Sequence, residues 1–525
     1  MQDLLGTSIE QIVDGENNAV EFDVAYPIRG DICETVEFVR RLHGDELLLL
    51  PMSATSSGGG IFQGAGNAGA KVVGLRFDAP LNPGLRFESP VDLRHVRQDE
   101  IVIDRERRQI SAGAAITLHQ LNRALADELG HQYKVPGADL TSYTYAAVGA
   151  TFMTGGMGPQ RRYFSDSVVE AAIYDGDRIN SVSGDALQGY AGTYGWSGIV
   201  CALRCRYYRF PANEIAFALP LSSDAARLAR LLAHLAPYVY LDLNPDEVVS
   251  QAGKKGIILG IEHVSCDSMQ PLLAQPDGNP AQRRGLDLQQ KCKAAGVDGL
   301  VFINGYSEQS SDEFLIGLTD DALADTFTIA GIDIDHAEVF NDPEDMRALR
   351  EAIPYAARTQ APDGRLVYKN HSDATIRMAP DEVRACSERL WQINCEYVGH
   401  VEQFFERNVA VEGQILVYGH LNPYGIDPHN RVTMSSDDDT AFANAREFLI
   451  EQRADYYRDL ASMCESSNAL FIGGEKSADS EIAIYAALQG PQHAPAALFA
   501  RFQQQQETVR AADRLFNWRA LSPYR

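Results

Sequence analysis

Two glycine-rich segments of the chain contain residue types that could hold a flat or phosphorylated ligand. The first, residues 53–69, mixes serine, threonine and glycine directly after an apolar run. Backbone N–H groups and hydroxyls of such a loop can form a concavity for a pyrophosphate, although the same composition is also typical of a flexible surface loop. The second, residues 148–159, places small residues and glycines where we expect a strand to run into a loop. The backbone there could approach a ligand without side chains in the way.

Short strands and helices alternate around these segments. Asp31 is a capping residue followed by apolar positions at helical spacing, which predicts a helix, and the apolar run 47–50 predicts a buried strand. Residues 101–104 and 109–113 have β-type composition on either side of a polar tetrapeptide, which predicts a hairpin. These elements must position the two glycine-rich segments.

The pattern continues into the second half of the chain. A capping box predicts a helix over 117–130, and leucine spacing predicts another over 224–238. Apolar runs at 256–261 and 299–303 predict strands, and a long amphipathic stretch at 439–464 predicts a further helix. The chain therefore reads as a multi-domain protein of mixed helix and sheet.

Charge limits the classes of partner. With 46 Lys and Arg against 72 Asp and Glu, the net charge is −26, which argues against nucleic acid or an anionic membrane as a general partner. A small anionic substrate would therefore need a local cationic pocket. Cys201 and Cys205 are four positions apart in an apolar run, and we interpret them as buried thiols rather than a metal pair.

Targeting signals are not evident in the sequence. The first 21 residues lack the apolar core of a signal peptide, and no apolar run is long enough to span a bilayer. The scattered cysteines favour reduced thiols. We therefore expect a cytoplasmic protein, at most peripheral to a membrane, and a homo-oligomer.

Five blocks in order resemble the flavoproteins related to vanillyl-alcohol oxidase, with their PCMH-type FAD-binding domain, and most of all the FAD-linked D-lactate and D-2-hydroxyacid dehydrogenases. The blocks are residues 25–27, 50–53, 104–121, 147–163 and 192–200. The resemblance implies an α+β fold: a two-subdomain FAD-binding domain over 1–212, an α/β cap domain over 213–465, and a mostly helical C-terminal segment, 466–525, that returns to the first domain.

The same resemblance assigns residues to the cofactor. It implies that the FAD pyrophosphate lies against the loop that begins at Ser53. It implies that the flavin ring lies near small residues of the second glycine segment, with Val200 close to the adenine half. The implied FAD-binding residues are Ser53, Ala54, Thr55, Ser56, Ser57, Ala147, Gly149, Thr154, Gly155, Gly158 and Val200.

A substrate carboxylate is the implied ligand of two cations in the second half. Arg350 and Lys369 stand in segments similar to those that bind it in the D-2-hydroxyacid enzymes. A guanidinium can pair with a carboxylate in bidentate fashion, and an ammonium adds charge. For Arg350, a solvated position on a surface helix is the alternative interpretation.

A divalent metal, zinc or a similar ion, is the other implied ligand. His420 and His429 stand in a segment similar to the family's metal-binding loop, and Asp479 aligns with its third ligand block. The histidines are nine positions apart with prolines between them, so we expect no regular element to place them on one face. Asp479-Ser480 replaces the Glu-His of the family, which leaves His371, His420 or His429 as the candidate general base.

The resulting hypothesis is an FAD-dependent oxidoreductase that takes a hydride from the hydroxyl-bearing carbon of a small substrate, with a D-2-hydroxy acid as the favoured substrate. The electron acceptor would be oxygen, a quinone or an electron-transfer protein. One alternative is an oxidase of a phenolic or polyol substrate that needs no metal and uses Tyr163, Tyr418 or Tyr424. Others are a non-catalytic FAD-binding subunit and a scaffold protein without flavin.

Overall fold

The computed structural model describes most of the chain up to Phe471. The described residues are 12–13, 19–20, 24–28, 31–44, 47–52, 71–137, 142–156, 164–191, 198–222, 227–228, 230–231, 235, 238, 256–266, 269, 272, 280–320, 336–356, 366–373, 376–377, 383–422, 425–466 and 470–471. They divide into two compact units, one up to Tyr208 and one from Arg209. Nearly all of the predicted C-terminal segment, 466–525, lies outside the described residues, so its return to the first domain stays a prediction.

The first unit contains a small parallel sheet and a larger mixed sheet. The parallel sheet has the order β3-β5-β4, and the larger sheet has the order β11-β10-β12-β8-β7-β6, antiparallel except between β6 and β7. The strands are β1 (Ile12–Val13), β2 (Ala19–Val20), β3 (Val24–Pro27), β4 (Leu47–Met52), β5 (Lys71–Arg76), β6 (Gly84–Phe87), β7 (Glu100–Asp104), β8 (Gln109–Gly113), β9 (Tyr133–Lys134), β10 (Val168–Tyr174), β11 (Ile179–Ser183), β12 (Ile199–Arg206) and β13 (Tyr208–Arg209). The helices are α1 (Ile32–His43), α2 (Leu118–Leu129), α3 (Val148–Thr154), η3 (Leu93–His95), η4 (Phe164–Ser167) and η5 (Gly184–Gly189).

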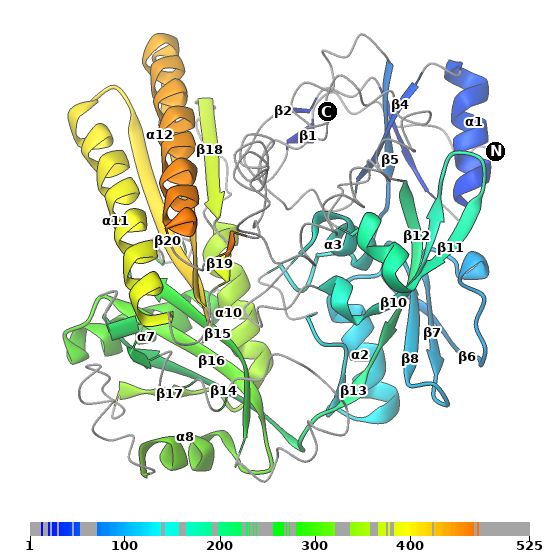
Figure 1. The fold of residues 1–525 in the computed structure, drawn as a ribbon, viewed down its shortest axis with the longest axis horizontal. Coiled ribbons are helices and arrows are strands. Elements are labelled where there is room, and N and C mark those ends of the chain that lie inside the picture. Colours follow the sequence, from blue (N-terminus) through cyan, green and yellow to red (C-terminus); the bar gives the residue numbers. More distant parts are fainter. Residues whose placement is uncertain are drawn as a thin grey trace. The chain divides into compact units, whose positions relative to one another are not determined.

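Local sequence signals explain the first helices. The Asp31 carboxylate accepts from the backbone N of Cys33 at 2.7 Å and so begins α1, which lies beside the parallel sheet (Figure 1). Both hydrogen bonds of the predicted capping box begin α2, which ends at Gly130 with φ 111°. The β7–β8 hairpin is also as predicted.

One prediction in the first unit is wrong. Residues 148–154 form α3 rather than a strand that runs into a loop. The helix packs on β8 and β12, where its small residues allow a close approach.

The second unit is built on one antiparallel sheet of order β17-β14-β16-β15-β20-β21-β18. Its strands are β14 (Asn213–Pro220), β15 (Ile257–Ser265), β16 (Gly299–Ser307), β17 (Glu338–Val339), β18 (Leu366–Asp373), β20 (Glu412–Asn422) and β21 (Gly425–Ser436); β19 (Ile376–Arg377) pairs with β22 (Leu470–Phe471). Its helices are α7 (Pro280–Ala295), α8 (Ser311–Asp320), α10 (Pro343–Ala356), α11 (Val383–Arg407) and α12 (Asp439–Glu465). In the segment predicted as a helix over 224–238, the described leucines 228, 231 and 235 are helical and buried.

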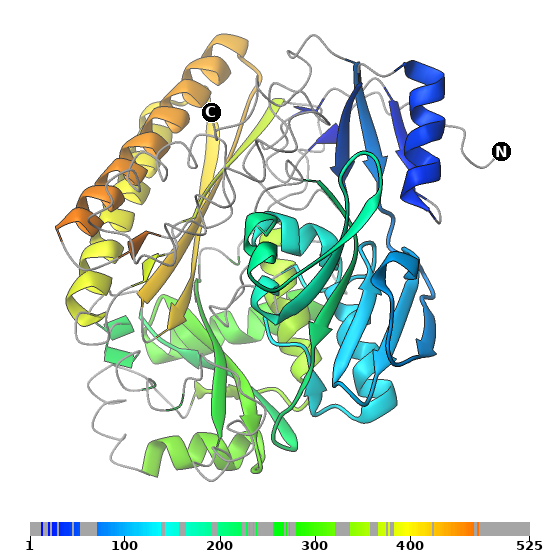
Figure 2. The same ribbon diagram turned by 45° about the vertical axis from the view of Figure 1, so that its right-hand side comes forward.

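Helices cover both faces of this sheet. On one face, α8, α11 and α12 enclose a core with the apolar side chains of β14, β15, β16, β20 and β21, and α11 and α12 run side by side across β18, β20 and β21 (Figures 1 and 2). On the other face, α7 and α10 enclose a second core with Ala216, Val264 and Phe302. The predicted α+β fold class is confirmed. Among the described helices, none has the length and apolarity needed to cross a bilayer.

Candidate functional site

The small residues of α3 serve two different purposes. Gly149 lies against the backbone after β8: its N donates to the Ala114 carbonyl oxygen at 3.1 Å, and a Cβ on Gly149 would lie 2.6 Å from the Ala114 Cβ. Gly155 adopts φ 68° and ends the helix, and the next backbone N, of Gly156, donates to Thr151 at 2.9 Å. Helix packing and helix termination thus account for these two glycines without any ligand.

The other residues assigned to the cofactor are placed as follows. Ala147 is the buried N-cap of α3, and the Thr154 hydroxyl donates to the Ala150 carbonyl oxygen at 2.9 Å. Val200 is buried in β12, opposite Ile173 of β10. Residues 53–57 and Gly158 lie outside the described residues.

The C-terminal end of α3 suits a flat ring better than its N-terminal end does. Thr154, Gly155 and Gly156 are all partly exposed and none has a bulky side chain. By contrast, the first backbone N–H groups of α3 are occupied, because Val148 donates to Ile116 at 2.8 Å and Gly149 donates to Ala114. The residues of the α3 end therefore fit a flavin ring, whereas Gly149 is used in packing.

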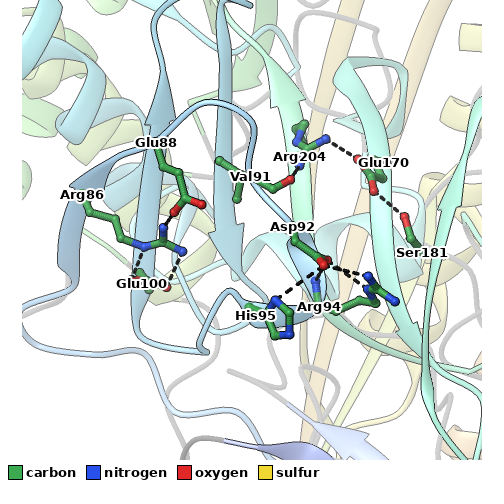
Figure 3. A network of polar contacts seen from close by, with 10 residues as sticks. All are labelled: Arg86, Glu88, Val91, Asp92, Arg94, His95, Glu100, Glu170, Ser181 and Arg204. Atoms are coloured by element: carbon green, nitrogen blue, oxygen red, sulfur yellow. Dashed lines mark hydrogen bonds and ion pairs between the residues drawn. The ribbon is translucent and has the colours of Figure 1, made fainter.

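A polar network holds the larger sheet of the first unit together (Figure 3). Arg204 of β12 pairs with Glu170 of β10 and donates to the carbonyl oxygen of Val91. Next to Val91, Asp92 caps η3 and pairs with the Arg94 guanidinium at 2.7 Å. Hydrogen bonding from Arg94 lowers the pKa of Asp92 to about 2. These contacts tie the segment before β7 to β10 and β12, so we assign them a structural role.

Ionisable residues share one face of the second unit's sheet. Residues directly opposite each other in a β-ladder lie on the same face, and positions alternate between faces along each strand. The pairs Glu262↔His420, His420↔Asp427 and Tyr418↔His429 link β15, β20 and β21 in this way, and Asp373↔His429 and His371↔Arg431 extend the face to β18. We call this surface the polar sheet face; its positions are Glu262, Lys369, His371, Asp373, Tyr418, His420, Asp427, His429 and Arg431.

The opposite face of the same strands packs against helices. Val432 and Met434 belong to the core formed with α11 and α12. Asn430 donates to the amide oxygen of Asn394 on α11 at 2.6 Å. The polar sheet face is therefore the face that α11 and α12 do not cover. It is continuous with the face on which α7 and α10 pack, because Val264 lies opposite Tyr418 and belongs to their core.

Arg350 reaches this face from α10. Its Nε donates to Glu262 Oε2, and both side chains are at most 3% exposed. The alternative interpretation of Arg350 as a solvated surface residue is therefore wrong. Because burying two charges is favourable only when they are paired, the Glu262 carboxylate balances the guanidinium inside the fold.

The predicted catalytic residues come together at the level of the backbone. His371 and His420 each lie diagonally from His429 on the polar sheet face, and Arg350 contacts the register neighbour of His420. Lys369 is two positions from His371 on the same strand and lies opposite Thr433, four positions from His429. The expectation that no regular element would place the two histidines together is wrong, since the β20–β21 hairpin puts both on one face.

The metal prediction is not decided by these positions. Among the described side chains there is no cluster of three or more His, Cys, Asp or Glu that suits a metal ion. The side chains of His420 and His429, and Asp479 as a whole, lie outside that set. The ligand set therefore stays a prediction.

Four residues of the polar sheet face were missed from the sequence: Glu262, Asp373, Asp427 and Arg431. A signal for three of them was present. Lys369, His371 and Asp373 alternate with other residues along one segment, and Asp427, His429 and Arg431 do so along another, which is the two-residue period of a strand. Glu262 had no such signal, because β15 shows no alternation of polar and apolar residues around it.

Solved structures with a similar fold identify the architecture. An alkyldihydroxyacetonephosphate synthase matches with a TM-score of 0.55 and 14% identity over 84% of this chain and 73% of its own. The 4-ethylphenol oxidase from Gulosibacter chungangensis matches with a TM-score of 0.55 and 12% identity over 96% of this chain and 88% of its own. The chain therefore has the fold of these structures.

A third solved structure with a similar fold is named for a substrate that differs from those of the first two. The 6-hydroxy-D-nicotine oxidase from Arthrobacter nicotinovorans matches with a TM-score of 0.50 and 13% identity over 96% of this chain and 92% of its own. No protein-family model and no curated protein sequence matches the chain. The resemblance stated from the sequence is thus confirmed at the level of the fold, and the substrate has to be argued from this chain's own residues.

Proposed function

We propose that the protein is an FAD-dependent oxidoreductase that oxidises the hydroxyl-bearing carbon of a small anionic substrate, a D-2-hydroxy acid. The observation that carries the proposal is the polar sheet face, where cations and imidazoles occupy adjacent register positions within the fold of FAD-linked oxidoreductases. In a chain of net charge −26, the cationic positions Lys369 and Arg431 are where an anion would bind, with the carboxylate positions Asp373 and Asp427 on the same face. FAD, when bound, accepts the hydride.

Lys369 and Arg431 are the proposed anchors of the substrate carboxylate. They stand on neighbouring strands, with Lys369 opposite Thr433 and Arg431 opposite His371. Arg350 is proposed as a positioning residue, because its charge is balanced by Glu262. It would hold β15 in register beside His420. The imidazoles of His371, His420 and His429 are the candidate acceptors of the hydroxyl proton.

A divalent metal remains part of the proposal. His420 and Asp427 are directly opposite each other, and His429 is two positions from Asp427 on the same face. Two imidazoles and a carboxylate are a ligand set that zinc accepts, and Asp427 would serve as the carboxylate if Asp479 does not. The metal, when bound, would polarise the substrate hydroxyl.

The test is the flavin spectrum of purified protein followed by anaerobic titration. We expect a yellow protein whose flavin is bleached by D-lactate, D-2-hydroxyglutarate or glycolate, with the L-enantiomers of the chiral acids inactive. Lys369→Met and Arg431→Met should each raise KM about tenfold by removing a charge-assisted contact. A protein that stays colourless after addition of FAD would refute the flavin assignment. A yellow protein reduced by none of these acids would refute the substrate class and favour a non-catalytic FAD-binding subunit.

A phenolic substrate is the second candidate. Tyr418 lies opposite both His429 and Val264 on the polar sheet face, and a tyrosine beside an imidazole could bind a phenol hydroxyl. This enzyme would reduce its flavin with a 4-alkylphenol and keep full activity in a chelator. Loss of activity in chelator, restored by zinc, would favour the hydroxy-acid enzyme. Reoxidation of the reduced flavin by oxygen, by a quinone or by an electron-transfer protein identifies the acceptor.

A further inference from the structure

Two cysteines far apart in sequence converge at one end of the second unit's sheet. Cys266 directly follows β15, and its backbone N donates to the Asp298 carbonyl oxygen at 2.7 Å. Cys292 lies in the last turns of α7, and its Sγ donates to the carbonyl oxygen of Gly299, the residue after Asp298, at 3.3 Å. Both residues pack in the core beneath α7 and α10, and their thiols are hydrogen-bonded to each other.

The two thiols differ in access. Cys292 is fully buried, whereas Cys266 is partly exposed. The hydrogen bond with Cys266, together with burial, raises the pKa of Cys292, so this thiol stays protonated at neutral pH. An oxidant from solvent would therefore meet Cys266 first.

We propose that Cys266 and Cys292 form a peroxide-oxidisable dithiol, which closes to a disulfide between the end of β15 and α7. In the first step, the Cys266 thiolate attacks one oxygen of hydrogen peroxide. The O–O bond breaks, and the departing hydroxide takes a proton to become water, which leaves a sulfenic acid on Cys266. In the second step, the Cys292 sulfur attacks the Cys266 sulfur and the S–O bond breaks. The hydroxide leaves as a second water with the Cys292 proton, so two thiols lose two electrons and peroxide gains them.

The disulfide would join segments 26 positions apart in sequence. It would anchor α7, which contacts α10 through the pair between Arg284 Nη2 and Asp345 Oδ2 at 3.1 Å. Because a cross-link of this span restricts the unfolded chain, we expect the oxidised protein to unfold at a temperature on the order of 5 °C higher.

The test treats the full-length protein with hydrogen peroxide, alkylates the remaining thiols and maps the peptides by mass spectrometry without reduction. We expect one cross-linked peptide pair containing Cys266 and Cys292, reversed by dithiothreitol, with a matching rise in Tm. Cys266→Ser should abolish both the cross-link and the Tm shift. Cys292→Ala should leave Cys266 to be trapped as a sulfenic acid by dimedone.

Cys395 supplies the matched control, because it is the more exposed thiol and lies on α11. Cys395→Ser should keep both the cross-link and the Tm shift. If peroxide consumes Cys395 while Cys266 and Cys292 remain alkylatable after denaturation, exposure alone governs oxidation and the proposal is wrong. Because Cys266→Ser replaces a partly exposed side chain, its folding can be confirmed independently by circular dichroism.

Discussion

At the scale of single residues, the buried pair of Arg350 and Glu262 joins α10 to β15, one of the strands of the polar sheet face. A sequence pattern could single out Arg350 as a cation, but it could not find the carboxylate 88 positions away that balances its charge. Such pairing depends on how α10 packs on β15, which is a tertiary property. The physical role of Arg350 thus differs from that of an exposed substrate ligand.

Removing one member of this pair should be costly. We expect Glu262→Gln to lower the free energy of unfolding by about 3 kcal/mol, because it leaves a buried guanidinium without its balancing charge. The measurement is urea denaturation monitored by circular dichroism. The control is Glu37→Gln, which breaks an exposed pair with Arg41 at 3.9 Å and should cost less than about 0.5 kcal/mol. Equal effects of the two substitutions would contradict the role assigned to the buried pair.

At the scale of elements, local sequence signals correctly predicted where α2 starts and where the β7–β8 hairpin turns. They did not predict that the glycine-rich segment at 148–154 is a helix. The capping box at Thr117 and the hairpin around residue 106 were recovered, since each depends on neighbours in sequence. The helix α3 was mistaken for a strand and loop, because Gly149 within it and the glycines that follow it disfavour a helix in isolation. Tertiary contact overrides that preference, since Gly149 allows α3 to approach Ala114.

The same reasoning applies to the β20–β21 hairpin. The prolines between His420 and His429 argued against a regular strand pair in this segment. Only the register of β20 and β21 shows that the two histidines share a face. The sequence could therefore name the chemical groups of the candidate site, while the sheet determines which of them are neighbours. For example, Lys369 and Arg431 are diagonal neighbours only because β18 pairs with β21.

Close packing at Gly149 leads to a prediction for α3. We expect Gly149→Ala to destabilise the protein by about 2 kcal/mol, because the added methyl would overlap Ala114. Flavin retention after gel filtration should fall as well. Gly399→Ala on α11 is the control: a Cβ there meets nothing within 4 Å, so the change should be neutral or stabilise by up to about 1 kcal/mol. A stable Gly149→Ala protein with full flavin content would show that the approach of α3 is not needed.

At the scale of the whole molecule, stability should depend on the pH because of a histidine in the second unit's core. His263 is fully buried on β15 and makes an edge contact with Trp391 of α11, with ring centroids 5.7 Å apart. Burial lowers the pKa of His263 to about 4, against a nearby contribution from Asp298 that raises it. The neutral imidazole is thus the form that the packed core accepts.

The direction of the pH effect follows from that pKa. In the unfolded chain His263 binds a proton with a pKa near 6.5. As the pH falls from about 6.5 towards 4, His263 is therefore protonated in the unfolded state but stays neutral in the folded state. The contribution of His263 to stability is complete above pH 6.5 and decreases through this window by up to about 3 kcal/mol.

We expect the urea midpoint of the wild type to fall between pH 7 and pH 4.5 by more than that of His263→Phe, which keeps an aromatic ring against Trp391 but cannot be protonated. His95, which is exposed and lies 3.5 Å from Asp92, supplies the control, and His95→Phe should retain the wild-type slope. If His263→Phe and the wild type lose stability in parallel over this range, the buried imidazole does not govern the acid sensitivity of the protein.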